Sequence, residues 1–179
     1  DVVKHLVVGE THDTILFFTS KGRVLQTKAY EVPVVGPNAK GTALVNLLNL
    51  QPEESVTATL NMSSGERSKH LFMATKKGVI KRSKLEDYNN IRQNGIIAIN
   101  LDEGDELHWV AQTDGEREVM LSTADGQALR FSENEVRPMG RSARGVKGMR
   151  LREGDQIVGM DIVVEGSTIV VVSENGYGK

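Results

Sequence analysis

Apolar residues recur along the chain in a pattern that repeats four times. Each instance is a run of β-branched or large apolar residues, a tight turn that ends in glycine, and a second extended run. The four instances begin at Ile15, Leu71, Val119 and Ile169, and their turn glycines are 56, 48 and 50 residues apart. Extended runs around a glycine turn predict β-hairpins. Asp125-Gly126 and Asn175-Gly176 favour a type I′ turn, which needs positive φ at both central positions.

A second element recurs in the same order, beginning at a glycine and leading into an acidic turn. It covers residues 41–50, 95–101 and 145–151, and the acidic turns follow at 51–54, 102–105 and 152–155. A further extended run comes after each acidic turn. Each unit therefore holds about four short strands in about 50 residues, which is the content of a propeller-type blade.

We expect an all-β fold, a propeller-like disc of repeated four-stranded antiparallel blades. Residues 1–179 are expected to form one domain fragment of about three and a half to four blades. Stacked neighbours bury both faces of a blade, so apolar runs such as 170–172 are expected to pack between blades. A β-sandwich with fortuitous regularity is the alternative. The approximate units are 1–37 (partial), 38–90, 91–139 and 140–179 (partial).

The composition is that of a folded protein, with 39% hydrophobic and 26% charged residues and a formal net charge of −2. The chain has no cysteine, which excludes a disulfide framework and thiolate-metal clusters and fits a reducing cytoplasm. No apolar run approaches the roughly 18 residues needed to cross a membrane. Because the first residue is Asp1 and the last residues fall within an expected strand, we expect a segment of a longer chain.

Positive charge recurs at two positions of the repeat, and we call these positions addresses. The first lies after the turn glycine, where the fourth residue is Arg82 or Arg130 in two units and the sixth is Lys28 or Lys84 in two units. Alternation along a strand places the fourth and sixth residues on one face. The second address is the loop before the second element, and it is most basic in residues 137–150, with five cations and no acid. Radial stacking of the blades would align these two positions into a basic stripe, and the acidic turns would lie elsewhere. A stripe of this kind can bind a polyanion along its length. Ordinary solvated surface charge is the alternative.

The cations at or beside these two addresses are the predicted DNA-contacting residues, an assignment that also draws on the resemblance described below. They are Lys28, Lys40, Lys81, Arg82, Lys84, Arg92, Arg130, Arg137, Arg141, Arg144 and Lys147.

Catalytic and metal-binding motifs are incomplete. Residues 140–145 are one position out of register for a G-x-S-x-G nucleophile elbow, and neither they nor residues 36–41 are followed by the Lys-Ser/Thr of a phosphate-binding loop. The four histidines lack metal-ligand spacing, and residues 102–106 lack the twelve-residue calcium loop. We therefore expect no catalytic residue, no metal site and no cofactor in this chain.

Three segments closely resemble the family of bacterial DNA gyrase A C-terminal domains: residues 17–24, 95–107 and 136–148. The resemblance runs along essentially the whole chain. It implies a β-pinwheel, in which blades exchange strands with their neighbours and duplex DNA wraps around a basic perimeter with positive handedness. Wrapping would direct strand passage toward negative supercoiling. The family's arginine- and glycine-rich gyrase-A box is missing, so we expect the chain to begin just after it and to bind DNA while wrapping it poorly.

The resemblance also implies partners and a location. The partners would be double-stranded DNA and the remaining parts of the gyrase A and B proteins in an A2B2 enzyme, without a membrane, in the cytoplasm and associated with the nucleoid. The parent would be an ATP-dependent type II DNA topoisomerase. This segment would not be an enzyme, because Tyr30, Tyr88 and Tyr177 lack the family's Ala-Ala-Thr-Arg-Tyr-Thr context. The alternatives are the related domain of topoisomerase IV and a protein-interaction platform without DNA binding.

Overall fold

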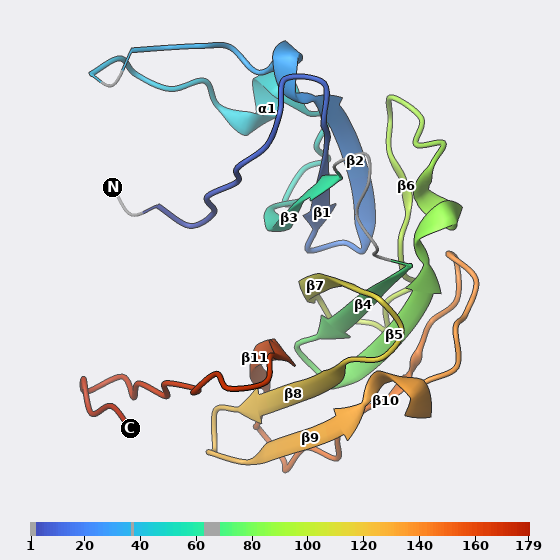
Figure 1. The fold of residues 1–179 in the computed structure, drawn as a ribbon, viewed down its shortest axis with the longest axis vertical. Coiled ribbons are helices and arrows are strands. Elements are labelled where there is room, and N and C mark those ends of the chain that lie inside the picture. The colour runs from blue at the N-terminus through green and yellow to red at the C-terminus, as the bar shows by residue number, and fades with distance from the viewer. Residues whose placement is uncertain (1–2, 37, 63–68) are drawn as a thin grey trace.

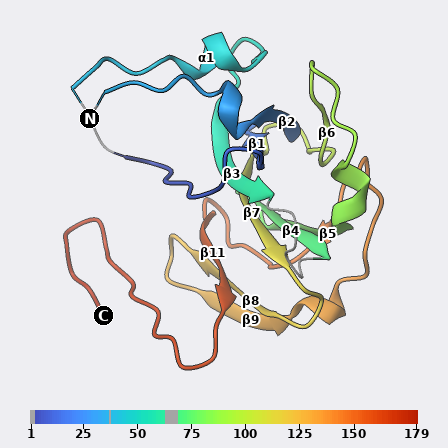
Figure 2. The same cartoon turned by 45° about the horizontal axis from the view of Figure 1, so that its top comes forward.

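Three antiparallel β-sheets follow one another around a curve and form part of a disc (Figures 1 and 2). The structure is a computed structural model, and it describes residues 3–36, 38–62 and 69–179. The strand order is β3-β1-β2-β6 in the first sheet, β10-β5-β4-β7 in the second and β11-β8-β9 in the third. The all-β, propeller-like architecture expected from the repeat is confirmed.

Each sheet is built on one of the predicted hairpins, which are the strand pairs β1 and β2, β4 and β5, and β8 and β9. Strands β3 and β11 both contact β7 on the inner side of the curve (Figure 1). Single 3₁₀ turns, η1 to η3, follow the hairpins. In chain order the elements are β1 (Thr14–Thr19), β2 (Arg23–Lys28), η1 (Ala29–Glu31), α1 (Leu44–Leu47), β3 (Val56–Met62), β4 (His70–Thr75), β5 (Val79–Lys84), η2 (Leu85–Tyr88), β6 (Ile96–Ile97), β7 (Leu107–Thr113), β8 (Glu118–Thr123), β9 (Ala128–Ser132), η3 (Glu133–Glu135), β10 (Val146–Lys147) and β11 (Ile157–Val163).

Neighbouring sheets exchange short outer strands. Strand β6 follows η2 in the chain, yet it pairs antiparallel with β2 of the first sheet. In the same way β10 follows η3 and pairs with β5 of the second sheet. The turn glycines continue these ladders, since Gly22 O accepts a hydrogen bond from Ala98 N at 2.8 Å and Gly78 O accepts one from Gly148 N at 2.9 Å. Each of the first two sheets is therefore completed by the unit that comes after it.

The sheets divide the chain differently from the predicted units. The strand after each acidic turn pairs with the hairpin before that turn, as β3 does with β1, β7 with β4 and β11 with β8. Three strands of the first sheet thus come from residues 14–62, on both sides of the predicted boundary near residue 37, and β6 is the fourth. The reason is that the acidic turn is anchored to the preceding hairpin: Glu54 Oε1 accepts a hydrogen bond from Thr19 Oγ1 at 2.6 Å. This contact brings the following strand alongside β1.

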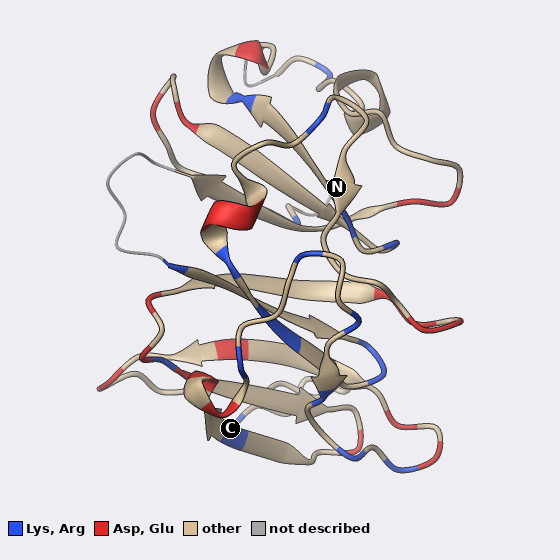
Figure 3. Ribbon diagram, turned by 90° about the vertical axis from the view of Figure 1, so that its right-hand side faces the viewer, with Lys and Arg blue, Asp and Glu red and all other residues tan. Residues whose placement is uncertain are grey.

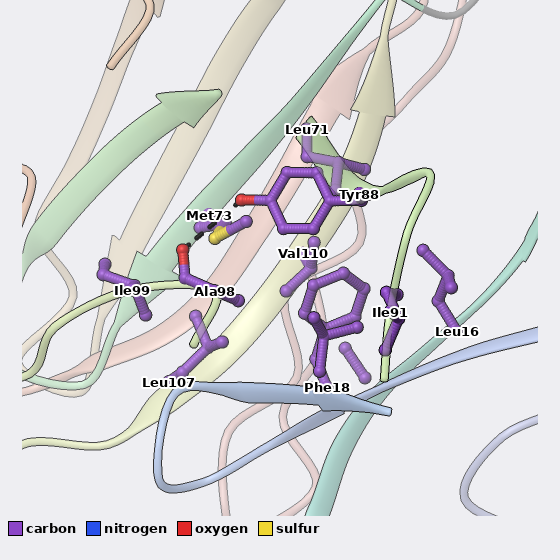
Figure 4. Packing of buried hydrophobic residues seen from close by; sticks show 12 residues of the cluster. Leu16, Phe18, Leu71, Met73, Tyr88, Ile91, Ala98, Ile99, Leu107 and Val110 are labelled. Carbon is purple, nitrogen blue, oxygen red and sulfur yellow. Dashed lines mark hydrogen bonds between the residues drawn. The ribbon is translucent and has the colours of Figure 1, made fainter. Parts of the chain in front are cut away.

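The sheets bury their apolar faces against one another. Alternate residues of β4 point to opposite sides, so Leu71 and Met73 pack with Phe18 between the first and second sheets (Figure 4). Phe72 belongs to a second cluster, with Leu121, between the second and third sheets. Both faces of the second sheet are therefore buried, as stacking of blades predicts.

The hairpin turns contain glycine as predicted but are not of type I′. Gly22, Gly78 and Gly126 have φ of 73°, 82° and 79°, whereas the only non-glycine residue with positive φ in the described part of the chain is Glu53. Asp125 therefore lacks the positive φ that type I′ requires. In the first two hairpins the loop has three residues with a left-handed glycine last, a common hairpin geometry that needs positive φ at one position. In the third hairpin the loop is 124–127, and the left-handed Gly126 is its third residue.

Two segments differ from the expected strands. The first copy of the second element, residues 41–50, contains α1 in place of a strand. The equivalent β6 and β10 are strands because each pairs with the hairpin of the preceding sheet. For residues 41–50 that partner would be a hairpin before β1, and the described residues contain none. The run 170–172 is 58–72% exposed, because no sheet in the described residues covers it. It nonetheless starts a turn, with Ser173 N donating to Tyr177 O at 2.8 Å.

Candidate nucleic-acid interface

Two loops run along the outer edge of the molecule, and we call them the outer-edge loops. The first, residues 89–95, connects η2 to β6, and the second, residues 136–145, connects η3 to β10. Each carries its chain from one sheet to the outer strand of the preceding sheet, so strand exchange places both loops on the same side (Figure 1). The loops are equivalent in the repeat, and the second contains most of the basic segment singled out in the sequence.

The second outer-edge loop is docked on the segment that follows β6. Asn100 Nδ2 donates to Ser142 O at 2.6 Å, and Asn100 N donates to Ala143 O at 3.2 Å. Arg141 Nη1 donates to Ile97 O at 2.8 Å. The glycines and proline of this loop leave it outside helix and sheet, and these contacts give it a defined course.

Three of the predicted DNA-contacting residues on or next to the outer-edge loops are exposed and free. Arg92 lies in the first loop, Arg137 in the second, and Lys147 in β10 at the end of the second. Across residues 3–36, 38–62 and 69–179 their side chains make no hydrogen bond or ion pair with the protein. Lys40 is also exposed and free within these ranges, but the segments 32–36 and 38–43 extend to the opposite side of the view in Figure 1. Strand exchange therefore gathers the first three and leaves Lys40 apart.

Five further predicted residues are partly or fully exposed but already have protein partners. Lys84 lies 3.2 Å from Glu86, Arg130 pairs with Glu118, and Arg144 pairs with Asp102. The bond to Glu118 raises the pKa of the Arg130 guanidinium. Exposed pairs of this kind are weak and exchange readily with other anions. The remaining two residues bond to neutral groups: Lys28 donates to Thr14 Oγ1 at 2.8 Å, and the half-buried Arg141 donates to Ile97 O.

The two remaining predicted residues are buried, and we remove them from the DNA-contacting set. Lys81 is 0% exposed and Arg82 is 6% exposed. Arg82 Nη1 donates to Asn134 Oδ1 at 2.9 Å and lies 3.7 Å from Glu133 Oε2. The cause is strand exchange: the chain from η3 to β10 crosses β5, and Met139 N bonds to Arg82 O at 2.7 Å. Alternation placed Arg82 and Lys84 on one face, but it could not show that a later segment covers Arg82.

The separation of basic and acidic residues is less complete than expected. Lysine and arginine alternate with aspartate and glutamate along the side of the disc that carries the outer-edge loops (Figure 3). Asp102, from an acidic turn, lies against Arg144 of the second outer-edge loop. The positive residues thus form separate positions and not a continuous stripe within the described structure.

The acidic turns have a structural role that sequence reasoning missed. One acid of each turn binds the glycine turn of the preceding hairpin: Asp105 Oδ1 accepts from Lys77 N at 3.0 Å, and Asp155 Oδ1 accepts from Asp125 N at 3.0 Å. Glu54 has the same place in the first sheet and also accepts from Arg23 Nη1 at 2.6 Å. The signal available in the sequence was the recurrence of such an acid 27 to 32 residues after each turn glycine.

The described residues contain no cluster of three or more histidine, aspartate or glutamate side chains that could hold a metal ion. Among the same residues, no helix has both the length and the apolar character needed to cross a membrane.

The fold and its exchanged strands define a propeller-like repeat domain of the pinwheel type. The family described as DNA gyrase C-terminal domain, beta-propeller, matches residues 13–61, 69–114 and 117–163, which is one match for each sheet. The chain belongs to this family.

Curated relatives and solved structures agree with this assignment. The DNA gyrase A protein of Staphylococcus epidermidis is 44% identical over 182 residues, which include 100% of this chain and 20% of the relative. The DNA gyrase A protein of Mycolicibacterium smegmatis is 42% identical over 181 residues, with 100% of this chain and 22% of the relative covered. The chain thus spans about a fifth of the length of these relatives.

Two solved domains superpose on nearly the whole chain. The crystal structure of the C-terminal domain of DNA topoisomerase IV matches with a TM-score of 0.85 and 33% identity, over 94% of this chain and 53% of that one. The DNA gyrase A C-terminal domain matches with a TM-score of 0.76 and 29% identity, over 95% of this chain and 54% of that one.

Proposed function

We propose that this chain binds duplex DNA without sequence preference along the outer-edge loops and bends it around the disc. The observation that carries the proposal is the placement of Arg92, Arg137 and Lys147, which are exposed, free of protein partners within the described structure and gathered on one side by strand exchange. Membership of the gyrase C-terminal family supports DNA as the ligand. Net charge does not oppose this, because local potential and not total charge guides a bound polyanion.

Backbone phosphates are the expected contacts. Binding by lysine and arginine releases counterions, so log K should fall against log salt with a slope of about −0.9 for each neutralised phosphate. Bending a site of 20–30 base pairs by 40–90° costs on the order of 1–6 kcal/mol, which several phosphate contacts can offset. Phosphate contacts carry no direct sequence information, so we expect little discrimination among duplexes of equal length.

Within a whole protein, the proposed role is that of the wrapping domain of gyrase A. There it would act with the rest of the gyrase A protein and with gyrase B in an A2B2 enzyme, an ATP-dependent type II topoisomerase of the bacterial cytoplasm and nucleoid. DNA wrapped with positive handedness would be returned to the cleavage site for passage, which directs the enzyme toward negative supercoils. The chain itself would supply binding and bending, without a catalytic group or cofactor.

A charge-reversal triplet tests the DNA-binding proposal. Arg92→Glu, Arg137→Glu and Lys147→Glu, combined, should reduce the salt slope by about 0.9 for each lost contact and abolish mobility shifts of long duplexes. The matched control combines Lys4→Glu, Lys21→Glu and Lys179→Glu, which change the net charge equally at exposed positions outside the outer-edge loops. If the wild-type chain has no affinity for duplex at low salt, a protein-interaction platform replaces this proposal. If both triplets bind alike, the DNA path lies elsewhere.

A second candidate is the corresponding domain of topoisomerase IV, because that solved domain superposes with a TM-score of 0.85. It would share DNA binding but deliver DNA differently. The two candidates separate in the parent protein: a gyrase introduces negative supercoils into relaxed plasmid, and a parent that only relaxes or unlinks DNA supports the second candidate.

A further inference from the structure

Lys81 is a buried cation at a position that is apolar in the other two sheets. It is the third residue after the turn glycine, and the equivalent residues are Leu25 and Leu129. Its exposed fraction is 0%, although it lies in β5 directly beneath the second outer-edge loop. A leucine would fill such a site at lower cost in desolvation, so the ammonium group requires an explanation from its contacts.

The ammonium group joins two segments that are far apart in the chain. Lys81 Nζ donates to Ala98 O at 2.7 Å and also to Arg141 O. Ala98 lies in the segment that continues β6, and Arg141 lies in the second outer-edge loop. Tyr88 Oη also donates to Ala98 O, at 3.3 Å, so this carbonyl receives two donors beneath the loop. Lys81 thus binds the loop backbone from below, while Asn100 binds it at residues 142 and 143.

We propose that Lys81 is a positioning residue for DNA binding, which fixes the backbone of the second outer-edge loop so that Arg137 and Lys147 are presented to the duplex. This inference rests on the function proposed above. Lys81 would contribute to affinity without touching DNA, because an ordered loop loses less conformational entropy when it binds.

Stability alone does not account for a lysine here. Replacing a buried ionic group with an apolar residue of similar volume is often neutral or stabilising. The change would nevertheless remove the donor to Arg141 O and leave the loop held from one side. Affinity and stability should therefore respond differently to the substitution, and a purely structural role would lower both together.

The protonation of Lys81 offers a second, variant-free observation. Burial lowers the pKa of this lysine to about 8, with Asp87 opposing the shift and Arg141 adding to it. A bound polyanion favours the protonated form, so DNA affinity should fall as pH rises through about 8. The stability of the fold should change in the opposite direction. The folded-state pKa of Lys81 lies below the ordinary lysine value of 10.5, so between about pH 8 and pH 10.5 the unfolded chain binds more protons than the folded chain. The free energy of unfolding therefore rises with pH over this range.

The test compares Lys81→Met with Lys21→Met, a change at an exposed lysine on a hairpin turn. At pH 7, Lys81→Met should weaken binding to a long duplex by about threefold to tenfold, the equivalent of one hydrogen bond, and Lys21→Met should not. Hydrogen exchange should quicken at the Asn100 amide, whose bond to Ala143 O reports docking of the loop. From pH 7 to 9 the wild-type affinity should fall more steeply than that of Lys81→Met.

The outcomes separate this inference from the proposed function. A wild-type chain without affinity for duplex at low salt removes both. A wild-type chain that binds, with unchanged affinity and exchange in Lys81→Met, overturns only the positioning role. If Lys81→Met does not fold, the wild-type pH titration decides, and an affinity that stays constant from pH 7 to 9 overturns the positioning role.

Discussion

The hairpins of the second and third sheets share one sequence pattern but have different surroundings. The second hairpin, β4 and β5, has β10 on its outer edge, whereas the third, β8 and β9, has no strand beyond β9 in the described structure. A Cβ added at Gly78 would meet Met149 O at 3.1 Å, and one at Gly126 would meet nothing within 4 Å. Equivalent positions in a repeat therefore differ in what a substitution costs, according to whether an exchanged strand covers them.

The equivalent arginines show the functional side of this difference. Arg82 is enclosed by the chain from η3 to β10 and lies against Asn134 and Glu133, while Arg130 is exposed and pairs with Glu118 of its own hairpin. The same residue type at the same address is thus an internal contact in one sheet and a surface cation in the next. A cation of the repeat can be assigned to DNA only after its covering segment is known.

The largest expected effect is on the buried pair. Glu133→Ala should destabilise the chain by about 3–5 kcal/mol, because it leaves Arg82 buried without its charged partner and removes the acceptor of Thr113 Oγ1 and Arg117 N. Glu118→Ala, which breaks the exposed pair with Arg130, should change stability little. Urea denaturation of both variants measures the difference. Equal urea midpoints for the two variants would show that Arg82, although covered, depends on its acidic partner no more than the exposed Arg130 does.

The next largest effect compares the space for a Cβ at a hairpin turn that an exchanged segment covers with the space at a turn that no such segment covers. Gly22 and Gly126 have similar φ, 73° and 79°, but a Cβ on Gly22 would lie 2.5 Å from Ile99 O. Gly126→Ala should cost about 1–2 kcal/mol for its left-handed backbone. Gly22→Ala should cost about 2–4 kcal/mol, since displacement of the exchanged segment adds to that strain. Thermal denaturation of the two variants gives the comparison, and a greater loss for Gly126→Ala would contradict it.

Sequence reasoning predicted the features that are local in the chain. The glycine turns, the hairpins on either side of them and the packing of both faces of the second sheet follow from apolar runs such as 71–74 and from turn chemistry. The three matching segments also identified the family correctly. These features depend on residues within one hairpin or on its stacking with the next.

The pairing of the exchanged strands could not be predicted from these local patterns. This pairing determines which lysine and arginine side chains are exposed. Strands β6 and β10 have two residues each, too few for a period, and their pairing with β2 and β5 joins residues more than 60 positions apart. The resemblance implied exchange but did not say which side chains it covers. Arg82 and Lys81 were misassigned for this reason, and the contacts of Glu54, Asp105 and Asp155 were missed because their partners lie in the preceding hairpin.

A smaller effect concerns those acids. Asp105→Ala should cost about 1–3 kcal/mol, because it leaves the Lys77 and Glu106 amides without their acceptor in a site where Asp105 is only 7% exposed. Asp155→Ala breaks the equivalent bonds at a half-buried position, where water can replace them, and should cost less. Urea denaturation ranks the two variants, and a larger loss for Asp155→Ala would contradict the ranking.

The same acid gives a pH dependence with a definite sign. Burial alone would raise the pKa of Asp155, but the nearby Thr123 side chain and the hydrogen bonds from the Asp125 and Gln156 amides outweigh it, so the pKa lies below its ordinary value of 3.8. A lowered carboxyl pKa contributes stability above the unfolded value, and that contribution is lost as pH falls through the folded value. An NMR titration of the carboxyl carbon should show a midpoint below that of a free aspartate, and a midpoint above it would contradict the hydrogen-bonded turn.

The smallest effect distinguishes a free surface cation from a paired one. Arg137 is exposed without a protein partner in the described structure, so Arg137→Gln should remove one phosphate contact and reduce the salt slope of DNA binding by about 0.9. Arg130 must first leave Glu118, so part of what it gains from a phosphate is lost with that pair, and Arg130→Gln should reduce the affinity less. The variant Glu118→Gln, with Arg130 unchanged, sharpens the comparison: release of Arg130 should strengthen binding at low salt and steepen the slope. An unchanged slope would place the duplex away from β9 and confine its path to the outer-edge loops, where exchanged strands have already brought the free cations together.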